Sequence, residues 1–211
     1  MLANVALGEL DRLWEAHCRR LGHLVRYADD FVILCRTEAE AREALRRAER
    51  ILARLGLRLH PNKTRVVDVR DGQRGFDFLG FHHRKVSSWR WQGNRYLQSW
   101  PSRRAMQAIR DRVKAITAPR HRLAEPRATI VADVNAVLRG WGAYFRVGNA
   151  SRQFAQIDYS VGERLGLWLR KKTGSSRGWE AGHREACLRT LGLHHLRGTM
   201  AWTTAAPTAA R

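Results

Sequence analysis

Cysteine is scarce in this sequence, and its placement excludes two common ways of stabilising a small fold. The three cysteines, Cys18, Cys35 and Cys187, lie far apart, and none belongs to a Cys-x-x-Cys pair of the kind that binds zinc. Their odd number and wide spacing also argue against a framework of disulfide bonds. We therefore expect a protein that folds in the reducing cytoplasm.

Long apolar runs are missing as well. No segment approaches the length of about 20 apolar residues that a membrane-spanning helix needs. The N-terminus has no basic region ahead of an apolar stretch, and Glu9 and Asp11 follow early, so we do not expect a signal peptide. These absences predict a protein without membrane contact and agree with the expected cytoplasmic location.

Acidic residues are few relative to basic ones. The 211 residues include 39 Lys+Arg and 19 Asp+Glu, which gives a formal net charge of +20. Such an excess is typical of proteins that bind nucleic acid, although a merely arginine-rich composition would explain it too. The hydrophobic content of 44% argues against a disordered basic tail and suffices for one core, or for a small domain with part of another.

The stretch from Arg26 to Leu34 carries the most information about function. Two adjacent acids, Asp29 and Asp30, lie between residues that favour β-strands, so the sequence predicts a hairpin with two carboxylates at its tip. Adjacent carboxylates repel each other unless a divalent cation neutralises them, and Mg²⁺ prefers oxygen ligands of this kind. The alternative is a solvated Asp-Asp turn in an ordinary hairpin.

Helices and strands are mixed in the first half of the chain. A helix is expected over residues 2–20, and a second helix begins at the capping-box pattern of Thr37 and Glu40 and ends before Gly56. Strands are expected at 57–59, 64–69 and 76–81, and a further hairpin over 85–97 that turns at Gly93-Asn94. This order predicts an α+β fold rather than a closed sandwich.

Three helical patterns fill the second half of the chain, beginning after Ser102, a suitable N-cap residue. Their apolar residues recur every three or four positions, which predicts a small three-helix bundle. The stripes are Met106, Ile109, Val113 and Ile116, then Val134, Leu138, Trp141 and Phe145, then Phe154, Ile157, Val161, Leu165 and Trp168. Beyond residue 172 we expect a linker at 173–176, one or two short helices within 179–196, and a disordered end.

Four further segments resemble the same protein family as the Tyr27-Ala28-Asp29-Asp30 motif does. They are residues 1–11 (MLANVALGELD), 59–64 (LHPNKT), 76–81 (FDFLGF) and 138–145 (LRGWGAYF). In this order, the segments resemble the reverse transcriptase/maturases encoded by group II introns. A retron-type or other non-intron reverse transcriptase fits less well because of the Arg-Gly-Trp-x-x-Tyr-Phe segment.

The resemblance implies a partial polymerase palm followed by an all-α thumb. The implied domains are the C-terminal part of a palm at 1–84, a hairpin or linker at 85–100, a maturase-specific thumb at 101–172 and a basic, partly disordered extension at 173–211. The family copies RNA into DNA with Mg²⁺ and assists the splicing and mobility of its intron RNA. RNA, including intron RNA, and a primer-template are therefore the expected partners.

The resemblance also assigns roles to individual residues. Asp29 is expected to bind the catalytic Mg²⁺ ions, with Asp30 in a supporting role. Near the nucleotide or primer we expect Tyr27, Lys63, Leu79 and Gly80, for which ordinary packing or solvation is the alternative.

A second catalytic carboxylate of the family has no counterpart here. The 211 residues contain no Asp-x-x-x-Phe-Asp motif, which supplies that carboxylate in the family. We therefore expect the chain to be inactive alone and to need an upstream reverse transcriptase fragment. The alternative is a non-catalytic RNA-binding remnant.

Basic residues dominate the predicted bundle. Residues 102–172 carry 15 Lys+Arg and 5 Asp+Glu, an excess of ten positive charges. Contacts from such side chains to phosphates give an affinity that does not depend on base sequence. The candidate nucleic-acid-binding residues are Arg103, Arg104, Arg110, Arg139, Trp141, Arg146, Lys171 and Lys172. For Gly140 and Gly142, close packing of helices is the alternative to an approaching phosphate.

Overall fold

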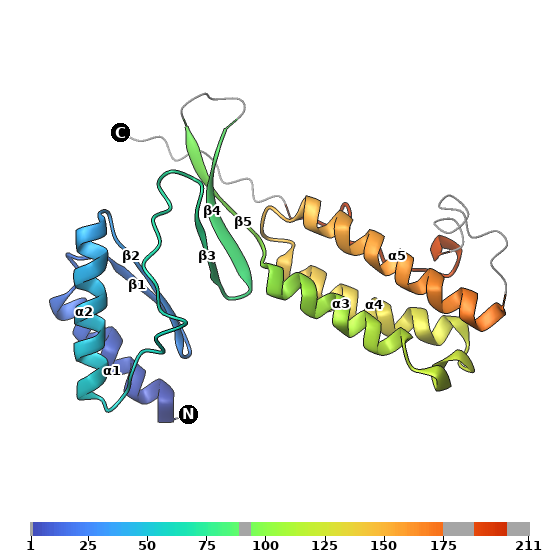
Figure 1. The fold of residues 1–211 in the computed structure, drawn as a ribbon, viewed down its shortest axis with the longest axis horizontal. Coiled ribbons are helices and arrows are strands. Elements are labelled where there is room, and N and C mark those ends of the chain that lie inside the picture. Colours follow the sequence, from blue (N-terminus) through green and yellow to red (C-terminus); the bar gives the residue numbers. More distant parts are fainter. Residues whose placement is uncertain (1, 89–93, 175–187, 202–211) are drawn as a thin grey trace. The chain divides into compact units, whose positions relative to one another are not determined.

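Helices and two small sheets make up the computed structural model, which describes residues 2–88, 94–174 and 188–201 (Figure 1). This mixture of helices and antiparallel sheets confirms the expected α+β class. The chain divides into two units, residues 1–79 with 83–97 and residues 80–82 with 98–211. Each unit has a hydrophobic core of its own.

Two helices and a hairpin form the core of the first unit. The hairpin strands pair antiparallel, with Tyr27 opposite Asp30 at the tip, and one face of the hairpin contributes Leu24 and Ile33 to the core between the helices. Leu10 and Trp14 are buried there. The elements in chain order are α1 (Leu2–His17), β1 (His23–Tyr27), β2 (Asp30–Leu34) and α2 (Glu38–Arg54).

The capping box predicted at the start of α2 is confirmed. The Glu40 N–H donates to the Thr37 hydroxyl, and the Thr37 N–H donates to the Glu40 carboxylate. Further along the helix, hydrogen bonds from Arg47 and Arg46 hold the pKa of Glu43 below its ordinary value. Much of the basic face of α2 is thus neutralised by acids of the same helix, as three- and four-residue spacings favour.

The segment after α2 contains no β-structure, so the strands predicted at 57–59 and 64–69 are wrong. It is an irregular loop with turns, in which the N–H groups of Lys63 and Thr64 both donate to the His60 carbonyl. A strand needs a neighbour to pair its backbone, and in the described chain no strand pairs with this stretch. Strand propensity without a partner does not make a strand.

Residues 76–81 form two strand ends and a turn rather than the single strand expected. Strands β3 (Gly75–Phe78) and β4 (Phe81–Ser87) are joined by Leu79 and Gly80, whose φ angles are 50° and 78°. Positive φ at both central residues is typical of a type I′ turn, but the Asn-Gly or Asp-Gly pair that usually signals this turn is absent.

The hairpin expected over residues 85–97 is confirmed in its strands. β4 pairs with β5 (Arg95–Pro101), so the second sheet has the order β3-β4-β5. Next to the turn, the Ser88 N–H donates to the Asn94 carbonyl. The predicted turn residue Gly93 lies outside the described residues.

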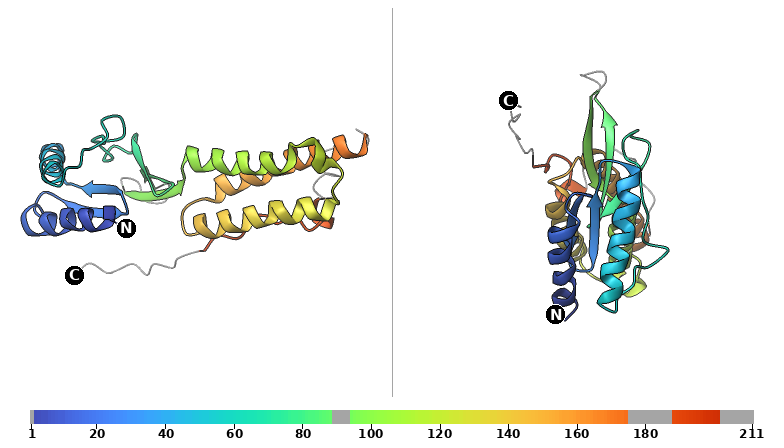
Figure 2. Two further views of the ribbon diagram at one scale, coloured as in Figure 1. Left: turned by 90° about the horizontal axis from the view of Figure 1, so that it is seen from below. Right: turned by 90° about the vertical axis from the view of Figure 1, so that its left-hand side faces the viewer.

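Three helices build the second unit in the predicted order. They are α3 (Arg103–Thr117), α4 (Arg127–Phe145) and α5 (Ser151–Thr173), with a short 3₁₀ helix, Arg120–Leu123, between the first two. Helix α3 packs against both others, and the three run side by side in Figure 2. In the described parts of the chain, no helix is both long enough and apolar enough to cross a bilayer.

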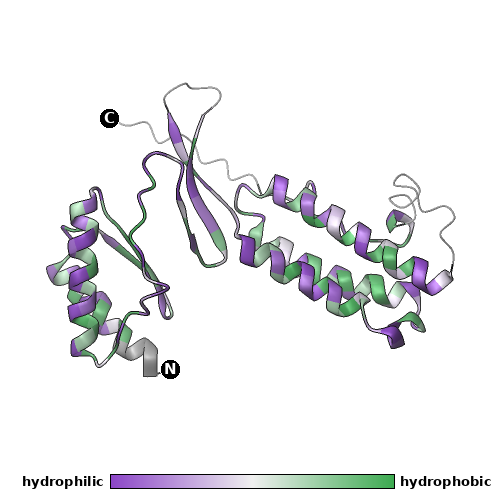
Figure 3. Cartoon of the chain, viewed as in Figure 1, coloured by the Kyte–Doolittle hydropathy of each residue, from purple (hydrophilic) through white to green (hydrophobic). Residues whose placement is uncertain are grey.

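The predicted stripes supply the core of this bundle. Every stripe residue is buried except Ile116 and Trp141, which are partly buried against the same core. Figure 3 shows the result as green apolar bands that alternate with purple polar bands along the helices. Ser102 caps α3 as expected, because its hydroxyl accepts a hydrogen bond from the Ala105 N–H at 3.2 Å.

Residues 188–201, here named the C-terminal strap, complete the core of the bundle. Leu188, Leu193 and Leu196 are buried among the helices, and Leu196 is fully enclosed. Only residues 188–190 of the strap are helical, whereas Trp179, expected in a short helix, lies outside the described residues. The strap therefore belongs to the bundle through its leucines.

Two polar side chains of the helices fasten the strap. The buried Asn135 amide donates to the Gly192 carbonyl at 2.8 Å, and its oxygen accepts the His194 N–H at 2.7 Å. The Asp158 carboxylate accepts the N–H groups of Leu196 and Arg197, both at 2.9 Å. Among the four backbone groups, the N–H of Leu196 belongs to a buried residue, and leaving such a group without a partner would be costly.

The strap gives the bundle a pH-dependent stability. Burial lowers the pKa of His194 from its ordinary value near 6.5; the charges of Arg139 and His195 act in the same direction, and Asp158 opposes them. The folded chain then binds this proton less readily than the unfolded chain, so stability falls as the pH drops below about 6.5. We expect urea unfolding to show this fall and His194→Gln to reduce it. Equal pH slopes for both proteins would contradict the assignment.

Candidate functional site

The two adjacent aspartates lie at the tip of the β1-β2 hairpin, as predicted. Ala28 and Asp29 form the two-residue turn, and Asp30 is the first residue of β2. Both carboxylates are exposed, and within the described chain neither has a hydrogen-bond or ion-pair partner. Tyr27, the last residue of β1, is 66% exposed, so the tip has little packing of its own.

The turn contains backbone strain. Ala28 has a φ of 54°, and the only other non-glycine residue of the described chain with positive φ is Leu79. The left-handed region costs an ordinary residue about 1–2 kcal/mol, and such strain often accompanies functional sites. Both strained residues occupy hairpin turns that contain predicted site residues.

Arg26 connects this tip to helix α1. Its Nε donates to the two carboxylate oxygens of Asp11 at 2.9 and 3.0 Å, and its Nη2 donates to one of them as well. Its Nη1 donates to the Ala28 carbonyl at 2.8 Å. Hydrogen bonding to Asp11 raises the pKa of Arg26. The sequence analysis missed this pair, because its two residues meet only when α1 lies beside the hairpin.

The chemistry of the tip fits part of a magnesium site. Mg²⁺ commonly takes one or two carboxylates and completes its six ligands with water and substrate phosphates. Asp29 and Asp30 offer such carboxylates, and no cation of the described chain competes for them by ion pairing. The described residues contain no group of three or more His, Cys, Asp or Glu side chains that could hold a metal ion. The tip is therefore a partial ligand set.

The other predicted nucleotide or primer residues lie in turns. Lys63 is exposed in the loop after α2, and Leu79 and Gly80 form the turn between β3 and β4. The Gly80 carbonyl accepts the Ser102 N–H at 2.8 Å, and a Cβ added to Gly80 would lie 3.4 Å from the Phe145 ring. Contacts of these residues with a nucleotide or primer stay a prediction.

The predicted nucleic-acid-binding residues of the bundle fall into two groups. Those on its surface are Arg103, Arg104, Arg139, Arg146 and Lys171, with Arg110 half-buried. Lys172 instead donates to the carbonyls of Leu123 and Glu125, both at 2.6 Å. Trp141 lies partly buried against Phe145 and Phe154. The first group is thus the more accessible to a ligand.

The two glycines of α4 differ in their surroundings. A Cβ on Gly142 would lie 2.6 Å from the Leu196 side chain, so this glycine is needed for packing of the strap. A Cβ on Gly140 would meet no atom within 4 Å. Packing therefore explains Gly142, whereas Gly140 is exposed and needs no such explanation.

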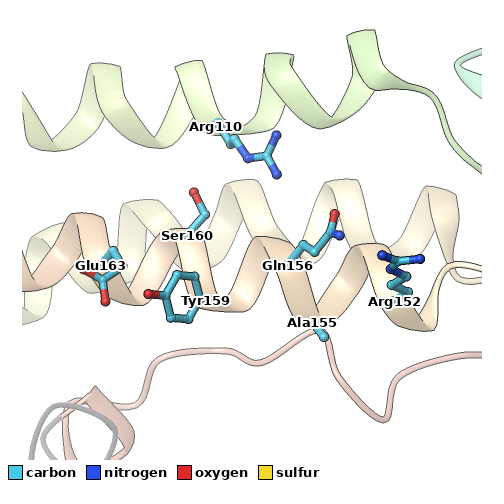
Figure 4. Close-up of a pocket in the computed structure, with 7 residues that line it drawn as sticks. All are labelled: Arg110, Arg152, Ala155, Gln156, Tyr159, Ser160 and Glu163. Carbon is cyan, nitrogen blue, oxygen red and sulfur yellow. The ribbon is translucent and has the colours of Figure 1, made fainter. Parts of the chain in front are cut away.

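An open groove between α3 and α5 contains one predicted binding residue, Arg110, together with α5 residues that were not among the candidates. Arg110 faces it from α3, and α5 contributes Arg152, Gln156 and Tyr159, among others (Figure 4). These α5 residues follow one another at three- or four-residue intervals, the spacing of one helix face. This spacing of polar residues could have indicated a binding face on α5, but the apolar stripe of the same helix is the stronger pattern.

Comparison with protein families assigns the two parts of the chain. The family described as reverse transcriptase (RNA-dependent DNA polymerase) matches residues 1–83, and the family described as group II intron, maturase-specific domain, matches residues 106–186. The chain belongs to the group II intron reverse transcriptase/maturase family. No curated protein matches the chain significantly.

Membership of this family gives the observed site a general chemical context. Reverse transcriptases use divalent metal ions, and group II intron reverse transcriptase/maturases act with RNA and a primer-template. The tip carboxylates, Lys63 and the Leu79-Gly80 turn all lie inside the reverse transcriptase match. The α3-α5 groove lies inside the maturase-specific match, and so does Asn135, which hydrogen-bonds to the strap.

Proposed function

We propose that this reverse transcriptase/maturase chain contributes part of a polymerase palm and a thumb, with Asp29 and Asp30 as Mg²⁺ ligands. The observation that carries the proposal is the pair of exposed, unpaired carboxylates at a strained hairpin tip. In this assignment the first unit is palm and the three-helix bundle is thumb.

Asp29 is the main ligand and Asp30 the supporting one. When bound, Mg²⁺ stabilises the charge that develops on the transferring phosphoryl group. Catalysis of this kind needs carboxylates on both sides of the metal ions, and the tip provides one side. The remaining carboxylate comes from another palm segment, so polymerisation needs this chain together with that segment.

The bundle surface binds RNA through phosphates. Exposed arginines such as Arg103 and Arg104 lie at the start of α3, clear of the apolar core. Guanidinium contacts to phosphate provide affinity without reading bases. Binding of structured RNA is therefore expected even where the chain does not polymerise.

A non-catalytic RNA-binding protein is the second candidate. The partial ligand set at the hairpin tip favours it, because two carboxylates alone hold magnesium weakly. In that case Asp29→Asn would leave every function of the chain unchanged. Polymerisation in the presence of a complementary palm segment separates the two candidates.

RNA binding by the whole chain should depend steeply on salt. If about five basic side chains reach phosphates, log K should fall with log salt at a slope of roughly −3.5 to −4.5. Replacing Arg103 and Arg104 together by Gln should weaken binding to all RNAs alike and flatten the slope by up to ~2. Filter binding across a salt series measures both effects.

The double replacement of Arg46 and Arg47 by Gln is the matched control. It removes the same charge, but from guanidinium groups already paired with Glu43 on α2. We expect a much smaller change in slope. An affinity insensitive to salt, or a loss confined to one RNA sequence, would exclude recognition through phosphates.

A further inference from the structure

We infer that Arg26 is a positioning residue for the Asp29-Asp30 turn and that Asp11 anchors it. This inference rests on the proposed metal-binding role of the turn. One guanidinium joins two different elements: Nε and Nη2 face the Asp11 carboxylate on α1, and Nη1 faces the Ala28 carbonyl. Its side chain is only 16% exposed, whereas the aspartates at the tip are exposed.

Apart from the backbone pairing of Tyr27 with Asp30, the turn has little else to hold its shape. Ala28 keeps a left-handed φ of 54° without the freedom of glycine. Tyr27 is largely exposed, and in the described chain no other side chain hydrogen-bonds to the backbone of the turn. A strained conformation persists only where its surroundings determine it. The hydrogen bond from Arg26 is therefore a specific restraint on this turn.

The restraint acts directly on Asp29. The Ala28 carbonyl belongs to the planar peptide group that ends at the Asp29 Cα. Fixing this carbonyl fixes the plane from which the Asp29 backbone continues, and so limits the directions available to its carboxylate. A metal ligand held in this way loses less freedom when a cation binds, as is typical of outer-shell partners.

Asp11 also offsets the positive charge of Arg26 near the turn. An uncompensated guanidinium so near in sequence to Asp29 and Asp30 would repel a divalent cation at the turn. The two-oxygen pairing with Asp11 offsets that charge while leaving Nη1 free to hold the Ala28 carbonyl. A lysine has one nitrogen and lacks the planar fork, so it does not replace Arg26 at both acceptors.

The test compares Arg26→Lys with Arg12→Lys in the full chain. Arg12 is a matched control, because it makes a similar two-point pair with Glu9 on α1, and within the described chain it donates no hydrogen bond to the turn. Amide NMR signals of residues 28–30 report the turn without metal, and Mn²⁺ alone serves as the probe for binding. Thermal unfolding of each variant measures any general loss of stability.

We expect Arg26→Lys to shift the turn signals and to weaken Mn²⁺ binding by roughly tenfold, with Arg12→Lys unchanged in both. Asp11→Asn, which keeps the guanidinium, should weaken Mn²⁺ binding in the same direction. In an Ala28→Gly background, where the strain is relieved, Arg26→Lys should alter the turn signals less.

Arg26 would be an ordinary structural residue if its replacement lowered stability but left the turn signals and Mn²⁺ binding like those of Arg12→Lys. A separate outcome concerns the proposed function. If Mn²⁺ binding in the unaltered chain did not depend on Asp29, the metal site would be wrong. The turn signals without metal would still decide the role of Arg26.

Discussion

Replacing Asp29 by Asn is expected to lower RNA-templated DNA synthesis by at least about 10³-fold in a complex of this chain with a complementary palm segment. A catalytic metal supplies several kcal/mol of transition-state stabilisation, and each 1.36 kcal/mol is tenfold in rate. Loss of the main ligand removes most of that contribution. Primer extension on an RNA template with Mg²⁺ measures the effect, and Asp30→Asn should cost less.

Asp71→Asn is the control for this experiment. Asp71 is also exposed in a turn, where its carboxylate accepts the Gln73 N–H at 2.9 Å, and it lies outside the hairpin tip. We expect activity close to that of the unaltered complex. If the chain alone extended a primer, and Asp29→Asn abolished this, a second copy would be supplying the other carboxylate. Extension indifferent to Asp29 would overturn the palm assignment.

Replacing Leu196 by Ala is expected to destabilise the bundle by about 2–5 kcal/mol, the range for a fully buried leucine. The change leaves a cavity between the strap and α4, beside Gly142. Because domain stabilities total only about 5–15 kcal/mol, the variant should unfold at clearly lower urea concentration. The loss of the helical circular dichroism signal with increasing urea concentration measures this unfolding.

Leu167→Ala is the matched control for this substitution. Leu167 lies on α5 and is 38% exposed, so its truncation creates no enclosed cavity. We expect a change within about 0.5 kcal/mol, as for most surface substitutions. If Leu196→Ala and Leu167→Ala unfolded alike, the strap would not be part of the bundle core.

Because the strap is part of the core, the segment expected to be stable on its own is longer than the three helices. The sequence pattern suggested that the bundle ends near residue 172, because the apolar spacing weakens there. In the structure, however, Leu188, Leu193 and Leu196 belong to the core, with Asn135 and Asp158 fastening the backbone between them. A fragment that stops at 174 should therefore be less stable than one that continues to 201.

Local sequence determined much of this protein. The capping box of Thr37 and Glu40, the N-cap Ser102 and the three apolar stripes act within a few residues, so their helices could be predicted from spacing alone. The Asp29-Asp30 hairpin was predicted in the same way, since strand formers flank a turn-forming pair. The family could also be recognised, because its motifs are short and lie in order along the chain.

Only the tertiary structure decided the features that depend on distant neighbours. Residues 64–69 have strand propensity, but no strand of the described chain pairs with them. The turn at Leu79 and Gly80 divides an apolar segment that the sequence predicts as one strand. Residues far apart in sequence meet in the ion pair of Arg26 with Asp11 and in the packing of Leu196 against Gly142. Such contacts have no local signature, because backbone pairing and side-chain packing are settled by which elements meet in space.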